Sequence, residues 1–293
     1  MKLICGPNCD YSLASQASIK LGAEIVECCV RNKTDQTSEI KIEASFDRDP
    51  VIIAESLVLP LHTNFMNLLL MIDAIKRNGA GKIHAFIPYF GYGRQDRIIV
   101  GGAVPAQLAV KLISASGADD VCCIDTHSET DGIDNILSTS LFAESIKQHL
   151  VTTPLPNRAI VLAPDKGSVP RAKQLANLLN LSYVFILKNR SSYGVVSGEV
   201  SESKMTESCI IIDDIVDSGA TMDYACFNAT RLGAKNIIIC CTHLINHAAI
   251  QTIMSKYPQI SRILTTNSVK QKRDLDKLTV LDISDLFARR IVK

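Results

Sequence analysis

Short runs of apolar, mainly β-branched residues alternate along the chain with longer segments in which apolar residues recur at helical spacing. A strand that is apolar at every position is typical of a parallel sheet with both faces covered. The predicted helices are 63–80, 104–118, 169–180 and 220–234, several of them followed by a capping glycine. The predicted strands are 51–56, 82–89, 120–125, 159–165, 182–188, 208–214, 236–243 and 262–267. This alternation indicates an α/β fold.

The order helix, Gly-Ala, strand recurs in both halves of the chain, as "NGAGKIHAF" and "SGADDVCCID" early and "LGAKNIIIC" late. We therefore predict two tandem α/β domains of similar build, each with a mainly parallel central sheet flanked by helices. A length of 293 residues suits two domains. Turn residues in "TTPLPN" favour a boundary nearby, and we place the domains at 1–143 and 144–293, with the last helix packing back on the first domain.

Composition limits the kind of partner. The hydrophobic fraction is 47%, the charged fraction 21% and the formal net charge +1, so no general attraction to nucleic acid or membrane is expected. No apolar run is long enough to span a bilayer, and the start of the chain lacks the apolar core of a signal peptide. We expect a cytoplasmic protein.

The ten cysteines lie largely inside apolar runs, including the adjacent pairs in "VECCV", "VCCID" and "IICCT". Adjacent residues on a strand point to opposite faces, so such a pair cannot bind one metal ion together. Cys5 and Cys9 have no second ligand pair at zinc-finger spacing. We interpret the cysteines as reduced, small core residues of a cytoplasmic protein.

An apolar run ends at two adjacent acids in "CIIIDDIVDSGAT", residues 209–221. Ligands of open parallel sheets bind beyond the carboxyl ends of the strands, where Asp213 and Asp214 are predicted to lie. The turn 217–221 leads into a helix, whose open N–H groups suit a phosphate, while carboxylates accept hydrogen bonds from vicinal hydroxyls. Together they predict a sugar-phosphate site. The alternative is a solvated strand end, with Asp217 or Ser218 serving only as a helix cap.

This segment resembles the phosphoribosyl-diphosphate signature of type I phosphoribosyltransferases. Four further segments resemble the ribose-phosphate diphosphokinase (PRPP synthetase) family in the same order: "NFMNLLLMIDAIKR", "IPYFGYGRQDR", "APDKGSVPRAKQLA" and "ILTTNSV". The resemblance covers nearly the whole chain and implies two phosphoribosyltransferase-type, Rossmann-like domains. It also implies Mg²⁺-dependent transfer of the diphosphoryl group of ATP to O1 of ribose 5-phosphate, giving PRPP and AMP.

The resemblance implies roles for the acidic strand ends of the second half. Asp165 in "DKGSVPRA" would bind Mg²⁺, and the open N–H groups of this loop would hold the transferred diphosphate. From the residues alone, a plain strand-to-helix turn is the alternative. The diphosphate loop comprises Asp165, Lys166, Gly167 and Ser168, and the ribose 5-phosphate set comprises Asp213, Asp214, Asp217, Ser218, Gly219, Ala220 and Thr221.

The resemblance places ATP mainly on the first half. The implied ATP-binding residues are Arg94, Gln95, Asp96, His127 and Glu39, with His127 in "DTHS" also contacting Mg²⁺ or phosphate. Arginine suits a triphosphate oxygen. Without the family, residues 94–96 fit a surface loop with an internal Arg–Asp pair equally well, and a lone histidine at a strand end is more often structural.

The segment "ILKNRSSYGVVSGEVSES", residues 186–203, turns from apolar to polar with Gly and Ser throughout. The resemblance implies a flap that closes over the phosphates, with Lys188 and Arg190 as catalytic cations. A solvated hairpin is the alternative.

Three regions depart from the family. The adenine-contacting Phe-x-Asp-Gly-Glu loop, often shared across a subunit boundary, matches "KTDQTSEIKI" at 33–42, where only Glu39 is retained. The segment after "DTHS" is short and lacks paired aromatics, and "RIIVGGAVP" replaces a basic stretch. We expect a homo-oligomer built from dimers, up to a hexamer. Two other functions remain open: a silent regulatory paralogue of the synthetase, and a base phosphoribosyltransferase.

Overall fold

The computed structural model describes residues 1–35, 37–96, 100–152, 159–190, 196–200, 207–272 and 275–292. These residues form two compact units. The first domain comprises 1–137, 267–270 and 282–292, and the second comprises 138–266 and 271–281. The sequence-based division after residue 143 falls inside helix α4 (Thr139–Thr152), which belongs to the second domain.

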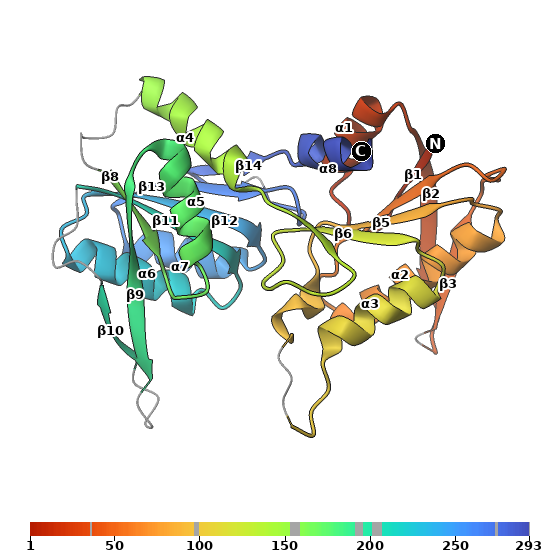
Figure 1. The fold of residues 1–293 in the computed structure, drawn as a ribbon, viewed down its shortest axis with the longest axis horizontal. Coiled ribbons are helices and arrows are strands. Elements are labelled where there is room, and N and C mark those ends of the chain that lie inside the picture. The colour runs from red at the N-terminus through yellow and green to blue at the C-terminus, as the bar shows by residue number, and fades with distance from the viewer. Residues whose placement is uncertain are drawn as a thin grey trace. The chain divides into compact units, whose positions relative to one another are not determined.

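The first domain has a seven-stranded sheet in the order β3-β2-β1-β4-β5-β6-β7, parallel except for the edge pair β2/β3 (Figure 1). Helices α1 and α8 pack together, as do α2 and α3. The elements are β1 (Lys2–Cys5), α1 (Tyr11–Leu21), β2 (Glu24–Asn32), β3 (Ser38–Ile42), β4 (Val51–Ala54), α2 (Leu61–Arg77), β5 (Ile83–Ile87), the 3₁₀ turn η1 (Gly91–Arg94), α3 (Pro105–Ala115), β6 (Asp120–Ile124), β7 (Asp134–Ile136) and α8 (Ser284–Ile291).

The second domain repeats this plan in the order β10-β9-β8-β11-β12-β13-β14, with an antiparallel edge pair β9/β10. In each sheet the chain first adds strands on one side of the first strand, which is β1 or β8, and later adds strands on its other side. The strand order therefore switches between β1 and β4 in the first sheet, and between β8 and β11 in the second. The remaining elements are β8 (Ala159–Ala163), α5 (Val169–Leu179), β9 (Ser182–Arg190), β10 (Val196–Val200), β11 (Ser208–Val216), α6 (Ala220–Arg231), β12 (Asn236–Leu244), α7 (His247–Lys256), β13 (Ile260–Thr266) and β14 (Leu278–Leu281).

Strand β11 is apolar from Cys209 to Ile212 because helices cover both faces of its sheet. Cys209 and Ile211 join the core that contains residues of α6 and α7. Ile210 and Ile212 join a second core with residues of α4 and α5. Side chains alternate between faces along a strand, so two covered faces require a run without polar interruptions.

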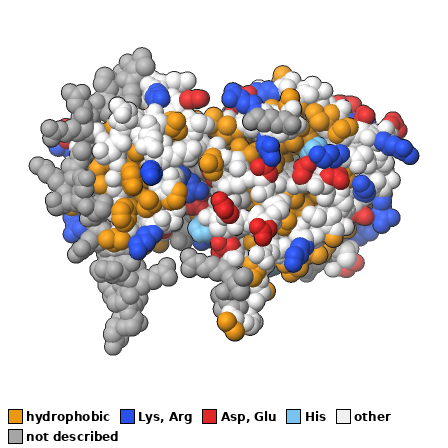
Figure 2. All heavy atoms as spheres, in the orientation of Figure 1, with side chains coloured by type: hydrophobic (Ala, Val, Ile, Leu, Met, Phe, Trp, Pro, Cys, Tyr) orange, Lys and Arg blue, Asp and Glu red, His pale blue; other side chains and the backbone are white. Residues whose placement is uncertain are grey.

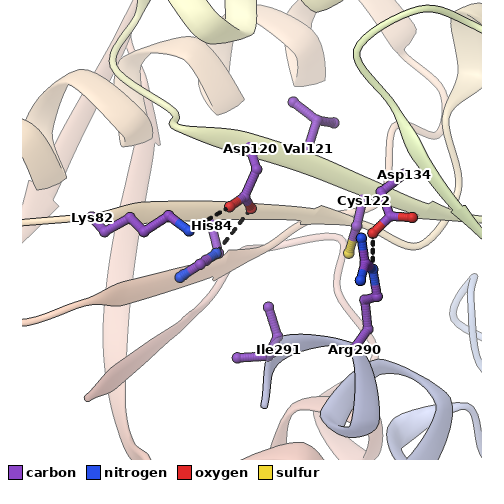
Figure 3. Close-up of a pocket in the computed structure, with 8 residues that line it drawn as sticks. All are labelled: Lys82, His84, Asp120, Val121, Cys122, Asp134, Arg290 and Ile291. Carbon is purple, nitrogen blue, oxygen red and sulfur yellow. Dashed lines mark hydrogen bonds and ion pairs between the residues drawn. The ribbon is translucent and has the colours of Figure 1, made fainter. Parts of the chain in front are cut away.

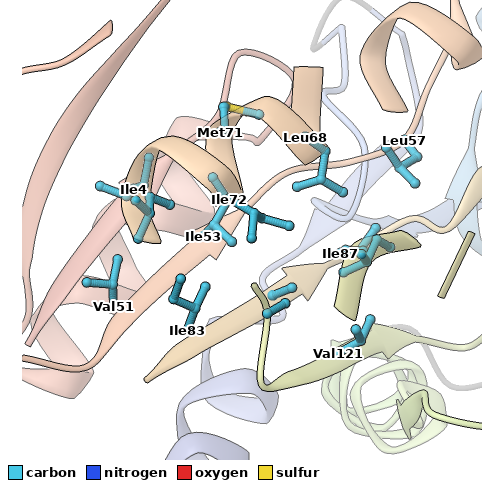
Figure 4. Packing of buried hydrophobic residues seen from close by; sticks show 14 of the residues in the cluster. Ile4, Val51, Ile53, Leu57, Leu68, Met71, Ile72, Ile83, Ile87 and Val121 are labelled. Carbon is cyan, nitrogen blue, oxygen red and sulfur yellow. The ribbon is translucent and has the colours of Figure 1, made fainter. Parts of the chain in front are cut away.

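Helices also cover the central sheet of the first domain. One core joins β1, β4, β5 and β6 to α2 and α3, and Figure 4 shows Ile53, Ile72 and Leu68 packed between strand and helix. Leu68, Met71 and Ile72 are fully buried and recur at helical spacing, which explains why this part of α2 could be recognised from the sequence.

The predicted fold class is confirmed, and all eight predicted strands and four predicted helices are present with shifted ends. The sequence pattern missed three helices (α1, α4 and α7) and the short or outer strands β1, β2, β3, β7, β10 and β14, while the last helix, α8, was expected without bounds. Strand β2 mixes exposed and part-buried positions, because it lies beside the edge strand β3, so it lacks the continuous apolar signal.

All ten cysteines are free thiols, and seven of them are buried. Cys240 and Cys241 belong to different cores, as expected for neighbours on a strand. Within the described ranges, the structure contains no helix long and apolar enough to cross a membrane. Figure 2 shows acidic and basic side chains interspersed over the face in view, in keeping with a net charge of +1.

Candidate functional site

The loop between β8 and α5 is folded around one carboxylate. Asp165 Oδ1 accepts hydrogen bonds from the backbone N–H of Gly167 (3.0 Å) and of Ser168 (3.2 Å). Lys166 and Gly167 are exposed, and no side chain caps the first turn of α5. The loop therefore presents an acid and a helix N-terminus at the carboxyl edge of the second sheet.

The acid pair lies beside this loop. Strand β11 pairs with β8 only as far as Ile211, whereas its pairing with β12 continues to Val216. Asp213 and Asp214 are thus inside β11, beyond the end of β8, and not at the end of the strand as predicted. The strand extends further because β12 continues beside it.

Ser168 joins the two parts of the site. Its hydroxyl donates a 2.6 Å hydrogen bond to Asp213 Oδ1, which also accepts from the backbone N–H of Asp214. Asp213 and Asp214 are only 6% and 5% exposed. Burial, followed by the charge of Asp214, raises the pKa of Asp213 to about 7, against the opposing hydrogen bond from Ser168. Two buried carboxylates of this kind need a cation or hydrogen-bond donors to be stable as anions.

The turn after β11 leads directly into α6. Gly219 is the residue before the helix and has φ 80°, a left-handed conformation that favours glycine. A Cβ at this position would lie 3.0 Å from the Cβ of Ala249. The Ser218 hydroxyl oxygen accepts a 3.5 Å hydrogen bond from the backbone N–H of Ala220, the first residue of α6, so a helix-capping role for Ser218 stays open as an alternative. Ser218 and Ala220 are exposed, whereas Asp217 and Thr221 are partly buried.

The proposed flap begins on β9. Lys188 and Arg190 occupy the end of this strand, where they pair with Gly198 and Val196 of β10. Their side chains lie outside the described part of the structure, as do residues 191–195 and 201–206. The strand period of two places both residues on one face of β9.

The first domain brings two predicted ATP-binding segments together. The turn η1 ends at Arg94, and a Cβ added to Gly93 would lie 4.0 Å from the backbone N of His127. Gly91 lies so close to Leu57 that a Cβ would come within 2.4 Å of its carbonyl oxygen. Arg94, Gln95 and His127 are exposed, and Asp96 is partly buried.

Further contacts hold the turn η1 in place. The ring of Tyr92 packs edge-on against Phe65 at a centroid distance of 5.0 Å, and its hydroxyl lies 2.8 Å from His62 Nδ1. The residues that present Arg94 therefore rest on α2.

Glu39 is not part of this grouping. It lies on edge strand β3, exposed, with its carboxylate 3.7 Å from Lys33 Nζ. Four strand spacings separate β3 from β5, about 19 Å at the usual spacing. Glu39 therefore cannot join Arg94 within one domain.

The switch in strand order of the first domain holds an acid that the sequence analysis missed. Glu55 follows β4, is fully buried, and accepts hydrogen bonds from the backbone N–H of Asn8 (2.9 Å) and its side-chain amide (2.6 Å). Burial, against those hydrogen bonds, raises the pKa of Glu55 to about 7. The signal was present in the sequence, because Glu55 ends an apolar run just as Asp213 does.

We expect the Glu55 carboxyl to make stability depend on pH. Its pKa rises from 4.5 unfolded to about 7 folded, so the folded state binds the proton more tightly. The free energy of unfolding should therefore fall by about 3 kcal/mol as the pH rises from below 4.5 to above 7. In Glu55→Gln, denaturant unfolding at pH 5 and pH 8 should show this slope reduced. Exposed Glu24→Gln is the control; an equal slope in both variants would contradict the assignment.

A pocket of about 230 Å³ lies elsewhere in the first domain, between α8 and the amino ends of β5 and β6 (Figure 3). Asp120 pairs with Lys82 (3.1 Å) and His84 (2.9 Å), and Arg290 pairs with Asp134. These charges neutralise one another, and ligands of parallel sheets bind at the opposite, carboxyl edge. We do not assign the active site to this pocket.

The chain contains two tandem α/β domains with the same strand order. At the carboxyl edge of the second sheet, an acid pair lies beside the N-terminus of a helix. These features define a phosphoribosyltransferase-type protein. Residues 1–117 match the N-terminal domain of ribose phosphate pyrophosphokinase, and residues 134–271 match the phosphoribosyl transferase domain.

Relatives that match nearly the whole chain support the same family. The ribose-phosphate pyrophosphokinase of Bacillus caldolyticus is 31% identical over 98% of this chain and 92% of its own length. That of Thermosipho africanus is 32% identical over 100% of this chain and 94% of its own. The crystal structure of phosphoribosylpyrophosphate synthetase from Mycobacterium smegmatis superposes with a TM-score of 0.88 at 28% identity, covering 99% and 97% of the two chains. The chain belongs to the ribose-phosphate pyrophosphokinase family and is an enzyme.

Proposed function

We propose that the protein transfers the diphosphoryl group of ATP to O1 of ribose 5-phosphate, forming PRPP and AMP with Mg²⁺ as cofactor. The observation that carries the proposal is the hydrogen bond from Ser168 to Asp213, which joins the loop of Asp165 to the buried acid pair. The proposed sugar-binding site and the proposed diphosphate-binding site would thereby be adjacent on one sheet edge. Full-length membership of the family supports the same reaction.

Ribose 5-phosphate would bind the second domain. Residues 217–221 would hold the 5-phosphate on backbone N–H groups at the start of α6, where the close approach of Gly219 to Ala249 fixes the turn. Asp213 and Asp214 would accept hydrogen bonds from the ribose hydroxyls. Hydroxyl donors would relieve the electrostatic repulsion between these two buried carboxylates, and this would favour binding of the sugar.

The residues present fit Mg²⁺, which prefers oxygen ligands and is commonly held by one or two carboxylates together with substrate phosphates and water. Asp165 supplies such a carboxylate, partly buried, at the loop proposed to hold the diphosphate. His127 would contact the ion or a phosphate from the first domain. The described ranges contain no cluster of three acidic, cysteine or histidine ligands, so a site completed by substrate is the arrangement consistent with this chain. The ion would neutralise phosphate charge.

ATP would be oriented by Arg94, Gln95 and Asp96 on the anchored turn η1, and Glu39 would reach the nucleotide of a neighbouring copy in a homo-oligomer. The loop 165–168 would hold the β- and γ-phosphates. Diphosphoryl transfer requires alignment and charge stabilisation more than a strong base. Lys188 and Arg190 would supply positive charge to the phosphate oxygens as O1 attacks and AMP leaves.

The proposal is tested by incubating the protein with Mg²⁺, ATP and ribose 5-phosphate. We expect AMP and PRPP in equal amounts. A silent regulatory paralogue would form neither product. A base phosphoribosyltransferase would consume PRPP in the presence of a base, and the match of both domains to the pyrophosphokinase family argues against it. The free cysteines are in keeping with action in the cytoplasm.

We expect weak nucleotide discrimination, because residues 33–42 contain no aromatic side chain to stack on a base. Loss of such a contact costs about 1 kcal/mol, a factor of roughly five in base binding, so the preference of kcat/KM for ATP over GTP or CTP should be weak. Steady-state rates with the three nucleotides measure this ratio. A preference for ATP of several hundredfold would show that other residues recognise adenine.

A further inference from the structure

Ser168 stands directly before α5, but its side chain does not cap this helix. A serine in this position usually accepts a hydrogen bond from an N–H of the first helical turn. Here the backbone of Ser168 is already helical, with φ −85° and ψ −6°, and its side chain makes no capping hydrogen bond. Pro170, the second residue of the helix, has no N–H to donate. The hydroxyl of Ser168 is therefore directed to a different partner.

That partner is Asp213. The Ser168 hydroxyl donates to Asp213 Oδ1 at 2.6 Å and lies 3.3 Å from Asp165 Oδ1. Because a hydroxyl has one proton, the shorter contact is the stronger hydrogen bond. Asp165 Oδ1 also accepts from the backbone N–H groups of Gly167 and Ser168. The loop at Asp165 is thus held by backbone donors, whereas the orientation of Asp213 depends on the serine side chain.

The contact between Ser168 and Asp213 is buried. Ser168 is 2% exposed and Asp213 is 6% exposed. Asp213 Oδ1 also accepts a 3.0 Å hydrogen bond from the backbone N–H of Asp214. The rotation of a carboxylate about its last side-chain bond is only weakly restricted by itself, so two donors on one oxygen fix it. Loss of the hydroxyl would leave Oδ1 with one buried donor fewer and would release this rotation.

The first domain shows a different solution at the related position. The two sheets share one strand order, and Asn8 follows β1 as Ser168 follows β8. Asn8 donates its backbone N–H to Glu55 Oε2 (2.9 Å) and its side-chain amide to Oε1 (2.6 Å), so both oxygens are occupied. A serine hydroxyl has a single donor and holds only one oxygen of the opposite carboxylate. The second domain therefore orients its acid without covering both oxygens through the loop.

We propose that Ser168 is a positioning residue that determines how strongly the protein distinguishes ribose 5-phosphate from sugar phosphates that lack a ring hydroxyl. By holding Asp213 Oδ1, Ser168 directs Oδ2 toward one hydroxyl of the sugar, while Asp214 accepts from the neighbouring hydroxyl. Ser168 acts through Asp213 and does not contact the sugar. This inference rests on the proposed function, because it takes Asp213 to bind the ribose hydroxyls.

The test is calorimetric titration of the full-length protein and of Ser168→Ala with ribose 5-phosphate, 2-deoxyribose 5-phosphate and 3-deoxyribose 5-phosphate. Alanine removes only the hydroxyl and keeps the backbone donors to Asp165. The unmodified protein should bind at least one deoxy sugar about tenfold or more weakly than ribose 5-phosphate. In Ser168→Ala this ratio of affinities should fall by about threefold or more. Asp213→Asn should lower the ratio for the same deoxy sugar, which identifies the hydroxyl that Asp213 binds.

Two further affinities separate positioning of Asp213 from general support of the fold. In Ser168→Ala, the affinity for inorganic phosphate and the KM for ATP should change by less than about twofold, because the turn 217–221 and the backbone of the loop 165–168 are retained. Ser255→Ala, which removes an exposed hydroxyl bonded within α7, is the matched control and should leave every affinity unchanged.

An unchanged ratio between ribose 5-phosphate and both deoxy sugars in Ser168→Ala would overturn the inference. Equal losses of affinity for all three sugar phosphates and for inorganic phosphate would also overturn it, because they would show a structural role only. Either result, with normal formation of PRPP by the unmodified protein, leaves the proposed function intact. Failure of the unmodified protein to bind ribose 5-phosphate would refute the proposed function, and this inference with it.

Discussion

Replacing Lys188 by alanine should lower kcat by about 100-fold or more, which corresponds to roughly 3 kcal/mol of transition-state stabilisation. Lys188 and Arg190 are two residues apart at the end of β9, so the strand period places them on one face. Their charge is most useful when negative charge spreads over the phosphate oxygens during transfer. Steady-state kinetics with saturating ATP and Mg²⁺ measure the effect.

The KM for ribose 5-phosphate should change much less in Lys188→Ala, because the proposed phosphate turn at 217–221 is a separate segment. Lys173→Ala, which removes an exposed lysine from α5, is the matched control and should retain normal kcat. A steep rise in KM at near-normal kcat would instead identify Lys188 as a substrate clamp.

Replacing Asp213 by asparagine should raise the KM for ribose 5-phosphate by about 10- to 100-fold, since a hydrogen bond to a charged group contributes roughly 1.5–3 kcal/mol. The substitution preserves shape while removing the charge proposed to bind the sugar hydroxyls. Calorimetric titration with ribose 5-phosphate measures the affinity directly, and ATP affinity should remain largely intact.

Asp276→Asn removes an exposed carboxylate from the same domain and is the matched control. Thr221→Val tests the phosphate turn independently and should also weaken ribose 5-phosphate binding. Unchanged affinity in both Asp213→Asn and Thr221→Val would remove the sugar phosphate from this edge of the sheet.

The comparison between Asp213 and Glu55 shows how much about a ligand site can be inferred from an acid that ends an apolar run. Both end an apolar run, both are buried, and burial raises the pKa of each to about 7. The carboxylate of Asp213 accepts a hydrogen bond from Ser168, which belongs to a loop with exposed residues. The carboxylate of Glu55 instead accepts a hydrogen bond from the side chain of Asn8 in its own domain. The same local pattern therefore accompanies a site proposed to bind ligand in one domain and an internal contact in the other.

The fold class, most of the inner strands and the order of the motifs follow from the sequence alone, because buried parallel strands require uninterrupted apolar runs and phosphate turns require small residues before a helix. The contacts between residues far apart in the chain could be found only from the three-dimensional structure. It revealed the short central strand β1 and the outer strands, whose mixed exposure gives no clear pattern, and it separated the strand of Glu39 from β5, which precedes Arg94, by four strand spacings. It also brought together Ser168 with Asp213 and Lys270 with Pro7, pairs 45 and 263 residues apart. Side-chain pairing of this kind depends on strand order, which no local spacing encodes.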